Sequence, residues 1–277
     1  MSHPTLSRLR QAGRILRVIA HLTKGVLLVW IVFPHINATQ RDAIIVGWSQ
    51  EMLKIFNARL RLLGNVPPAT LSSVLFTANH ISWLDILAIN AFQRVRFVAK
   101  AEVRQWPIVG WLAARTGTTF IRRSRHYELA RVSRMVSRSL RKGHCVALFP
   151  EGTTTDGTSI RPFHSGLFES AIEAEATVWP VGLRYLEPEG TADVGVAFLG
   201  EDSLIASMLR IVARPTTDIH LWFAPPLVAF GSTRRELAQQ AQDAIAQWVE
   251  GHRERADVPA MLRTMMPDPF FPPLSAA

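Results

Sequence analysis

The chain has 277 residues, 48% of them hydrophobic and 19% charged, so it can bury a full core and is too apolar to be a disordered protein. A single cysteine excludes a disulfide framework and a cysteine-rich metal site. The formal net charge of +9 is unevenly spread, because nine of the 31 basic residues but only two of the 22 acidic ones lie in residues 1–64. A basic, apolar N-terminal segment indicates an anionic partner, either a membrane leaflet or a nucleic acid.

Residues 8–33 are predicted to form one amphipathic helix. Its basic and histidine side chains recur at steps of three and four residues and share one stripe, which consists of Arg10, Arg14, Arg17, His21 and Lys24. The uninterrupted apolar run, residues 25–33, is shorter than the roughly 20 residues that cross a bilayer. We expect this helix to lie in the membrane interface without spanning it. The alternative is a helix that packs on the protein's own body.

A second helix is predicted from residue 39 to about residue 63, before Pro67 and Pro68 break the chain. Residues 1–64 are therefore interpreted as a two-helix, membrane-associating hairpin. Residues 65–277 are interpreted as the globular domain, which includes a C-terminal helix and a proline-rich tail at 261–277.

From residue 71 onward, short apolar runs alternate with helical stretches. Buried strands are predicted at 73–78, 95–99, 118–121, 145–149, 177–183, 194–199 and 219–223. Helices are predicted at 83–92, 127–142, 167–175 and 234–255. This alternation predicts an α/β fold with a mixed, mostly parallel sheet flanked by helices, to which the N-terminal hairpin is attached.

The segment Asn79-His80-Ile-Ser-Trp-Leu-Asp85 follows the first predicted strand and opens a helix. Ser82 is expected to cap that helix, which places Asp85 in its first turn, one turn above His80. A carboxylate there can fix the tautomer of the imidazole and stabilise the cation formed on proton uptake. The pair fits a general base acting on a substrate hydroxyl, since no G-x-S-x-G elbow occurs. The alternative is that Asp85 only caps the helix and His80 is a loop residue.

Two more motifs lie at predicted strand ends. The first, Gly117-Thr-Thr-Phe-Ile-Arg122-Arg123, enters a basic turn where either arginine can hold a phosphate bidentately. The second, Phe149-Pro-Glu-Gly-Thr153, has a glycine that permits close backbone approach and a hydroxyl that can hold an anion. The arginines of the predicted helix 127–142 are interpreted as a solvated face or a second membrane contact, and Cys145 as a small core residue.

Together the blocks resemble the glycerolipid (lysophospholipid) acyltransferase family, which includes the 1-acylglycerol-3-phosphate O-acyltransferases. The similarity rests on four blocks in one order: Asn79-His80…Asp85, Gly117…Phe120-Ile121…Arg123, Phe149-Pro-Glu-Gly-Thr153 and Val178-Trp-Pro-Val181. The family's domain would cover about residues 65–230.

The resemblance implies that His80 is the base and Asp85 its partner. It implies that the glycerol-phosphate part of the acceptor is bound by Arg123, Glu151, Gly152 and Thr153. It also implies acyl-CoA or acyl-carrier protein as the donor, no metal and no further cofactor. We therefore expect acylation of 1-acylglycerol-3-phosphate to phosphatidic acid, in phospholipid biosynthesis, at the cytoplasmic face of the inner membrane by a monotopic enzyme.

Two features leave the acceptor open. His164 stands where many members have a lysine, and the run Thr153-Thr-Thr-Asp-Gly157 is similar to bacterial branches that acylate lyso-ornithine lipid or other lysolipids. A rival of another class is a non-catalytic peripheral membrane-binding protein, but binding an anion requires neither His80 nor Asp85. A nucleic acid partner is not expected, because the basic excess lies on apolar helices and not beside stacking aromatic residues.

Overall fold

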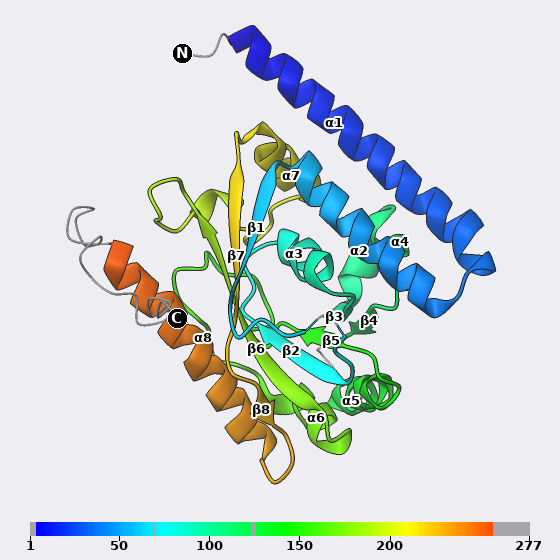
Figure 1. Cartoon of the computed structure of the whole chain (residues 1–277), viewed down its shortest axis with the longest axis vertical. Helices are drawn as coiled ribbons and strands as arrows, with labels where there is room; N and C mark the ends of the chain where they lie inside the picture. The colour runs from blue at the N-terminus through cyan, green and yellow to red at the C-terminus, as the bar shows by residue number, and fades with distance from the viewer. Residues whose placement is uncertain (1–3, 69, 123–125, 257–277) are drawn as a thin grey trace, which may run out of the picture.

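A mixed sheet organises the chain in the computed structural model, which describes residues 4–68, 70–122 and 126–256 (Figure 1). The strand order is β1-β7-β6-β2-β5-β3-β4, with β8 beside β6. The strands are β1 (Ala58–Gly64), β2 (Val74–Ala78), β3 (Arg96–Lys100), β4 (Thr119–Ile121), β5 (Val146–Leu148), β6 (Thr177–Leu186), β7 (Thr217–Phe223) and β8 (Leu227–Val228). Only the β6–β7 and β6–β8 pairings are antiparallel, so the predicted mostly parallel sheet is confirmed for the described residues.

Helices cover both faces of the sheet. They are α1 (Pro4–Leu27), α2 (Ala38–Ile55), α3 (Leu84–Phe92), α4 (Val109–Arg115), α5 (His126–Arg141), α6 (Glu169–Glu173), α7 (Leu204–Ala213) and α8 (Arg234–Ala256). Alternate residues of β2 divide between two cores: Phe76 packs in the cluster with α2 and α3, and Leu75 packs in the cluster with α5, α6 and α8. The sheet is therefore buried on both faces, as expected for parallel strands.

The strands β2, β3, β4 and β5 run parallel, so their carboxyl ends meet at one edge of the sheet. The segment after β2 carries His80, the segment after β4 carries Arg122, and the segment after β5 carries Glu151. This edge is where open α/β sheets bind their ligands, and it brings the separate sequence blocks together.

The first helix packs part of its basic stripe against the body. Arg14 donates to the carbonyl oxygen of Val212 at 3.0 Å, and Lys24 pairs with Glu51 of α2 at 2.6 Å. His21 is buried and stacks on Trp48 of α2, with ring centroids 4.7 Å apart. Of the five stripe residues, Arg10, Arg17 and Lys24 remain exposed, so only Arg14 and His21 are packed into the body.

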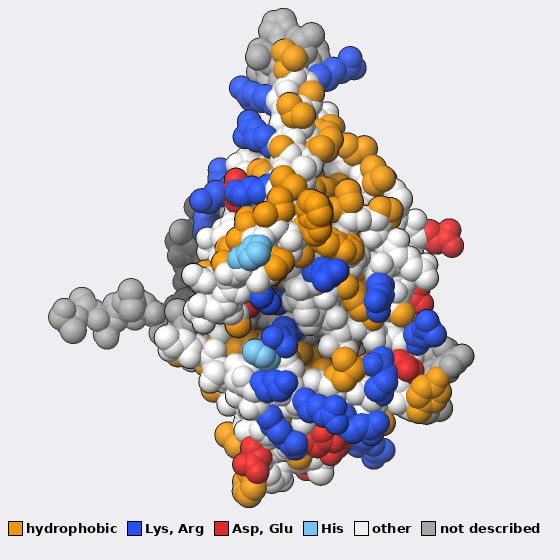
Figure 2. Space-filling model, turned by 90° about the vertical axis from the view of Figure 1, so that its right-hand side faces the viewer, with side chains coloured by type: hydrophobic (Ala, Val, Ile, Leu, Met, Phe, Trp, Pro, Cys, Tyr) orange, Lys and Arg blue, Asp and Glu red, His pale blue; other side chains and the backbone are white. Residues whose placement is uncertain are grey.

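The opposite face of α1 and of the turns that follow it is apolar and exposed. Its large side chains are Leu9, Leu16, Ile19, Leu27, Trp30 and Ile31, which recur with the period of a helix. By length and composition, the helical stretch Arg8–His35 could cross a membrane: it contains an 18-residue window with a mean hydropathy of 1.9, of which 17% is buried. Figure 2 shows hydrophobic side chains along the projecting helix, and Lys and Arg side chains gathered on the lower half of the same face.

Two predicted elements are wrong. The second helix ends at Ile55, and the next residues form β1, which pairs in parallel with β7. The alternation of Arg59 and Arg61 with leucines gives β1 one polar and one apolar face, which suits an edge strand. The predicted boundary after residue 64 therefore falls at the end of a sheet strand. The predicted strand at 194–199 is instead a 3-10 turn, Val194–Val196, which Asp193 caps through the N–H of Gly195.

The remaining predicted strands and helices are present with shifted ends, and two helices, α4 and α7, were not predicted. The arginines of α5 lie on its exposed side, as expected for a solvated face. Cys145 is buried, and burial raises the pKa of its thiol, which agrees with its predicted place in the core. The proline-rich tail lies outside the described residues.

Candidate active site

The loop after β2 is fixed to the sheet by Asn79. Its side-chain amide donates to the carbonyl oxygen of Leu183 on β6 at 3.0 Å and accepts from the N–H of the same residue at 2.7 Å. Because both polar atoms of this buried amide are paired, the next residue, His80, leaves the sheet at a defined point.

His80 and Asp85 form a hydrogen-bonded pair. The Nδ1 atom of His80 lies 2.7 Å from Oδ2 of Asp85, and the same oxygen accepts the N–H groups of Ile81 and Ser82 at 2.8 and 3.0 Å. With Nδ1 as the donor, Nε2 is left as the basic nitrogen of the imidazole. The histidine side chain is 19% exposed and the aspartate is fully buried, so the imidazole is accessible from outside while its partner is shielded from water.

The predicted cap at Ser82 is wrong. Helix α3 begins at Leu84 without a side-chain cap, and the hydroxyl of Ser82 has no hydrogen-bond partner among the described residues. Instead, Asp85 reaches back from the first helical turn to the two N–H groups that precede it. The carboxylate of Asp85 therefore binds the backbone at the start of the helix and the imidazole of His80 at the same time. The alternative, in which Asp85 only caps the helix, does not account for the contact with His80.

Tyr185 is a member of this network that sequence reasoning missed. Its hydroxyl donates to Oδ1 of Asp85 at 2.6 Å from β6. Burial, and then the negative charge of Asp85, raise the pKa of Tyr185 well above its ordinary value, so it remains a donor at physiological pH. The only signal for Tyr185 in the sequence was its position in the strand, where it shares a face with Val181 and Leu183.

Glu151 ties two loops together. One carboxylate oxygen accepts the N–H of His80 at 2.8 Å, and the other accepts the N–H of Arg161 at 3.0 Å. The side chain is buried, and burial raises its pKa above the ordinary range, although these two N–H groups oppose the shift. Both oxygens face the protein backbone, so the contacts of Glu151 are those of a positioning residue.

Two cavities adjoin the pair. The imidazole of His80 stacks on Phe149, with centroids 3.9 Å apart, and Phe149 lines a polar cavity of about 470 Å³. The ring of Phe97 also stacks on Phe149, with centroids 6.1 Å apart, and Phe97 lines an apolar cavity of about 190 Å³. Ala99 lines both cavities. Through its stacking on Phe149, His80 thus adjoins the place where a polar and an apolar cavity share a wall.

The polar cavity is bounded by the ends of β3, β4 and β5, by the loop at 164–167, and by α8. Its charged lining residues are Arg122 and Arg234, and His164 and Gly152 also line it. No aspartate or glutamate is among the lining residues in the part of the chain that the structure describes. A cavity with this lining favours an anionic guest.

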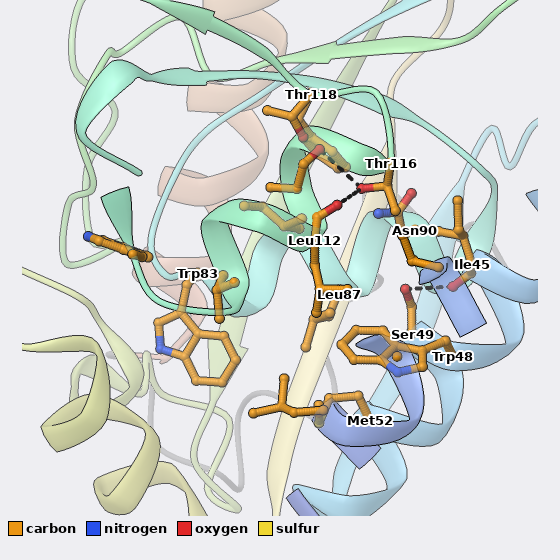
Figure 3. A pocket seen from close by; sticks show the side chains of 18 of the residues that line it. Ile45, Trp48, Ser49, Met52, Trp83, Leu87, Asn90, Leu112, Thr116 and Thr118 are labelled. Atoms are coloured by element: carbon orange, nitrogen blue, oxygen red, sulfur yellow. Dashed lines mark hydrogen bonds between the residues drawn. The ribbon is translucent and has the colours of Figure 1, made fainter. Parts of the chain in front are cut away.

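The apolar cavity lies between α1, α2, α3, α4 and α7. Figure 3 shows Trp48 and Met52 of α2 facing Leu87 of α3, with Trp83 at the opposite side. The polar groups near it are largely satisfied internally: the hydroxyl of Ser49 donates to the carbonyl oxygen of Ile45 at 2.9 Å, and that of Thr116 to Leu112 at 2.9 Å (Figure 3). Such a lining suits a hydrocarbon chain.

Some, but not all, of the site residues predicted from the sequence lie at this site. His80, Asp85 and Glu151 are joined by hydrogen bonds, and Gly152 lines the polar cavity with a positive φ of 76° that favours glycine. Thr153 is half-buried and does not line the cavity. Arg123 lies outside the described residues, whereas its neighbour Arg122 lines the cavity.

A profile of the protein family described as Acyltransferase matches residues 57–184. The lyso-ornithine lipid O-acyltransferase of Pseudomonas aeruginosa is 34% identical over 246 residues, which are 87% of this chain and 93% of that protein. The 1-acyl-sn-glycerol-3-phosphate acyltransferase of Neisseria meningitidis serogroup B is 39% identical over 185 residues, 66% of this chain and 71% of that protein. The crystal structure of PlsC from Thermotoga maritima, a 1-acyl-sn-glycerophosphate acyltransferase, matches with a TM-score of 0.62 at 18% identity, over 87% of this chain and 97% of that one.

The fold and the comparisons define an enzyme that transfers acyl groups. The chain belongs to the glycerolipid and lysolipid O-acyltransferase family, whose members are membrane-associated enzymes of lipid biosynthesis. The family resemblance found in the sequence blocks is thereby confirmed, and the relatives' names imply a lysolipid acceptor.

Proposed function

We propose that the protein transfers a fatty acyl group from a thioester donor, acyl-CoA or acyl-carrier protein, to the hydroxyl of 1-acylglycerol-3-phosphate, giving phosphatidic acid. The observation that carries the proposal is the position of the His80–Asp85 pair beside the junction of the two cavities. The apolar cavity accepts an acyl chain, and the polar cavity accepts the anionic head group.

The chemistry follows from the pair. Nε2 of His80 takes the proton of the acceptor hydroxyl as its oxygen attacks the thioester carbonyl carbon, and Asp85 stabilises the imidazolium. The tetrahedral intermediate then breaks its carbon–sulfur bond, and the leaving thiolate takes the proton from His80. No covalent enzyme intermediate, metal ion or further cofactor is needed, because the hydroxyl itself is activated.

The lining of the polar cavity supports a phosphate-bearing acceptor. Arg122 and Arg234 offer paired N–H donors, which match phosphate oxygens. Of the remaining residues assigned to the acceptor by resemblance, Gly152 lines the cavity, Thr153 follows it in the same turn, and Arg123 follows Arg122. Glu151 supports the site indirectly, through the backbone of His80.

Lyso-ornithine lipid is the second candidate acceptor, because the relative from Pseudomonas aeruginosa that bears this name matches over 87% of the chain. Its head group carries a carboxylate, which arginine also binds, and an ammonium group, which needs a carboxylate partner. The described lining of the polar cavity provides arginines for the carboxylate but no carboxylate for the ammonium group, which favours the phosphate monoester as acceptor.

We further propose that α1 holds the enzyme on the cytoplasmic face of the inner membrane without spanning it. The hydrogen bond from Arg14 to Val212 and the stacking of His21 on Trp48 keep one side of the helix against the body. The exposed apolar side, which includes Leu16 and Ile19, is free to enter a leaflet.

The proposal is tested with a panel of lysolipid acceptors and one acyl-CoA, with the products identified by mass spectrometry. We expect phosphatidic acid from 1-acylglycerol-3-phosphate as the main product. His80→Ala should abolish nearly all transfer while the protein stays folded, as judged by circular dichroism. Efficient turnover by folded His80→Ala protein would refute the assigned base, and a preference for lyso-ornithine lipid would replace the first acceptor by the second.

A further inference from the structure

We propose that Arg234, the first residue of α8, binds the anionic head group of the acceptor and sets the preference of the enzyme for acceptors that carry an anion. The inference rests on the acyl transfer proposed above and adds a residue to its site. Arg234 comes from a helix outside all four sequence blocks, and it lines the polar cavity with Arg122 and Gly152.

The backbone of Arg234 is held in place by its neighbours. The N–H of Thr233 donates to the carboxylate of Glu236 at 2.7 Å, and the N–H of Glu236 donates to the hydroxyl of Thr233 at 3.3 Å. This reciprocal capping pair defines where α8 begins. Leu237, one residue further, is fully buried in the core. The arginine side chain therefore projects from a fixed point at the wall of the polar cavity.

The walls of the polar cavity are also tied to one another. The N–H of Phe163 donates to the side chain of Gln242 on α8 at 2.7 Å, and the N–H of His164 donates to the carbonyl oxygen of Pro150 at 3.0 Å. These bonds link α8, the loop that carries His164 and the segment after β5. Arg234 thus has a defined position relative to Phe149, on which the imidazole of His80 stacks.

Among the residues that the structure describes, the charge of Arg234 has no strong partner. Its guanidinium lies 4.0 Å from the carboxylate of Glu169, and these side chains are 49% and 41% exposed. An ion pair of this length and exposure contributes little, because water screens it. A guanidinium can therefore turn to a phosphate or carboxylate in the polar cavity and form a charge-assisted, bidentate contact there.

The test compares Arg234→Gln with Arg235→Gln, in the full-length protein. Arg235 is the next residue, is also exposed and does not line the polar cavity, so this control makes the same charge change nearby. KM and kcat are measured for 1-acylglycerol-3-phosphate, for lyso-ornithine lipid and for monoacylglycerol, which has no anion, together with KM for acyl-CoA. Binding of the same three lipids to His80→Ala protein, with and without Arg234→Gln, gives a readout that needs no turnover.

We expect Arg234→Gln to raise KM for the acceptor with the bound anion about tenfold and to weaken its binding equally, as for the loss of a half-exposed charge-assisted bond. KM for acyl-CoA and the use of monoacylglycerol should not change, and Arg235→Gln should resemble the wild type. An effect confined to 1-acylglycerol-3-phosphate would show that Arg234 binds the phosphate, and an effect confined to lyso-ornithine lipid would show that it binds the carboxylate.

Equal behaviour of the two glutamine variants, an equal loss with monoacylglycerol, or a rise in KM for acyl-CoA alone would overturn the role of Arg234. Absence of transfer by the wild type to every acceptor would instead defeat the proposed function. In that case unchanged binding of 1-acylglycerol-3-phosphate and lyso-ornithine lipid after Arg234→Gln would still decide against this inference.

Discussion

Asp85 accepts four hydrogen bonds at a fully buried position: from the imidazole of His80, from two backbone N–H groups, and from the hydroxyl of Tyr185. A buried carboxylate is costly unless it is compensated in this way. The four donors fix the direction of the carboxylate and hence of the imidazole. The orientation of the imidazole is therefore set jointly by the loop after β2 and by strand β6.

Tyr185→Phe should lower kcat by roughly tenfold and leave KM for both substrates unchanged, because the lost hydroxyl contacts Asp85 and no cavity. Stability should fall by about 1–3 kcal/mol, since one oxygen of a buried carboxylate loses its donor. Steady-state kinetics and urea unfolding measure the two effects. The matched control for activity is Tyr127→Phe, at a tyrosine that is 61% exposed and does not contact Asp85, which should leave kcat unchanged.

Glu151→Gln distinguishes a positioning residue from a substrate ligand. A glutamine keeps one acceptor oxygen, but its NH₂ group then faces a backbone N–H, so one of the two bonds to His80 and Arg161 is lost. We expect the free energy of unfolding to fall by about 1–3 kcal/mol and kcat to fall, with an unchanged KM for the acceptor. A raised acceptor KM at unchanged stability would show instead that Glu151 binds the acceptor.

The same variant makes a pH-dependent prediction. Burial raises the pKa of Glu151 in the folded protein above its ordinary value of 4.5. The folded state then binds a proton more tightly than the unfolded state, so this group's contribution to stability is complete below that value. It is lost as the pH rises through the raised pKa of the folded state. Urea unfolding at several pH values should show the stability advantage of wild type over Glu151→Gln shrinking as the pH rises through this range.

Strand β6 and helix α8 meet at a glycine. A Cβ atom at Gly182 would lie 2.5 Å from Cε3 of Trp248, whose ring stacks on Trp222 of β7 with centroids 5.4 Å apart. Gly182→Ala should therefore destabilise the protein by about 1–3 kcal/mol through overpacking. In Gly47→Ala, the added Cβ meets nothing within 4 Å inside α2, and helix propensity should stabilise by up to about 1 kcal/mol. Urea denaturation curves of both variants check the two signs.

The elements that the sequence predicts well are those whose signal is local. The strands around Phe76 and Ala147 are buried on both faces and read as continuous apolar runs, and the pair His80–Asp85 is five residues apart. Strand β1 was misread because two of its seven residues are arginines and because it pairs with β7, far along the chain. Tyr185 and Arg234 were missed because only tertiary packing brings β6 and α8 to the site.

At the scale of the molecule, the exposed apolar face of α1 predicts membrane binding. Each of its large apolar side chains contributes roughly 1.5–3 kcal/mol when buried, whereas an exposed basic residue such as Arg17 contributes about 1 kcal/mol. Leu16→Glu combined with Ile19→Glu should therefore abolish flotation with anionic vesicles, and high salt should weaken flotation of the wild type only in part. Val228→Glu, at a side chain 72% exposed on β8, serves as the control.

Truncation is a poorer test of the same anchor. Removing residues 1–64 would delete β1, which pairs with β7 along seven residues, so a loss of binding could reflect a damaged sheet. The point variants leave the sheet intact. Undiminished flotation of the double glutamate variant would reject the anchor, and complete release of the wild type by salt would reject the apolar contribution.

The bond from Arg14 to Val212 and the stacking of His21 on Trp48 hold the first helix against α7 and α2, which pack on the sheet. With that helix lying in a leaflet, His80 stays at a constant height above the lipid and meets substrate by lateral diffusion. The relevant concentration is then an amount per area, so the rate should follow the mole fraction of lysolipid in the bilayer and fall on dilution with inert phospholipid at constant bulk lysolipid. One bound enzyme would acylate successive lipids of a single leaflet before it returns to solution.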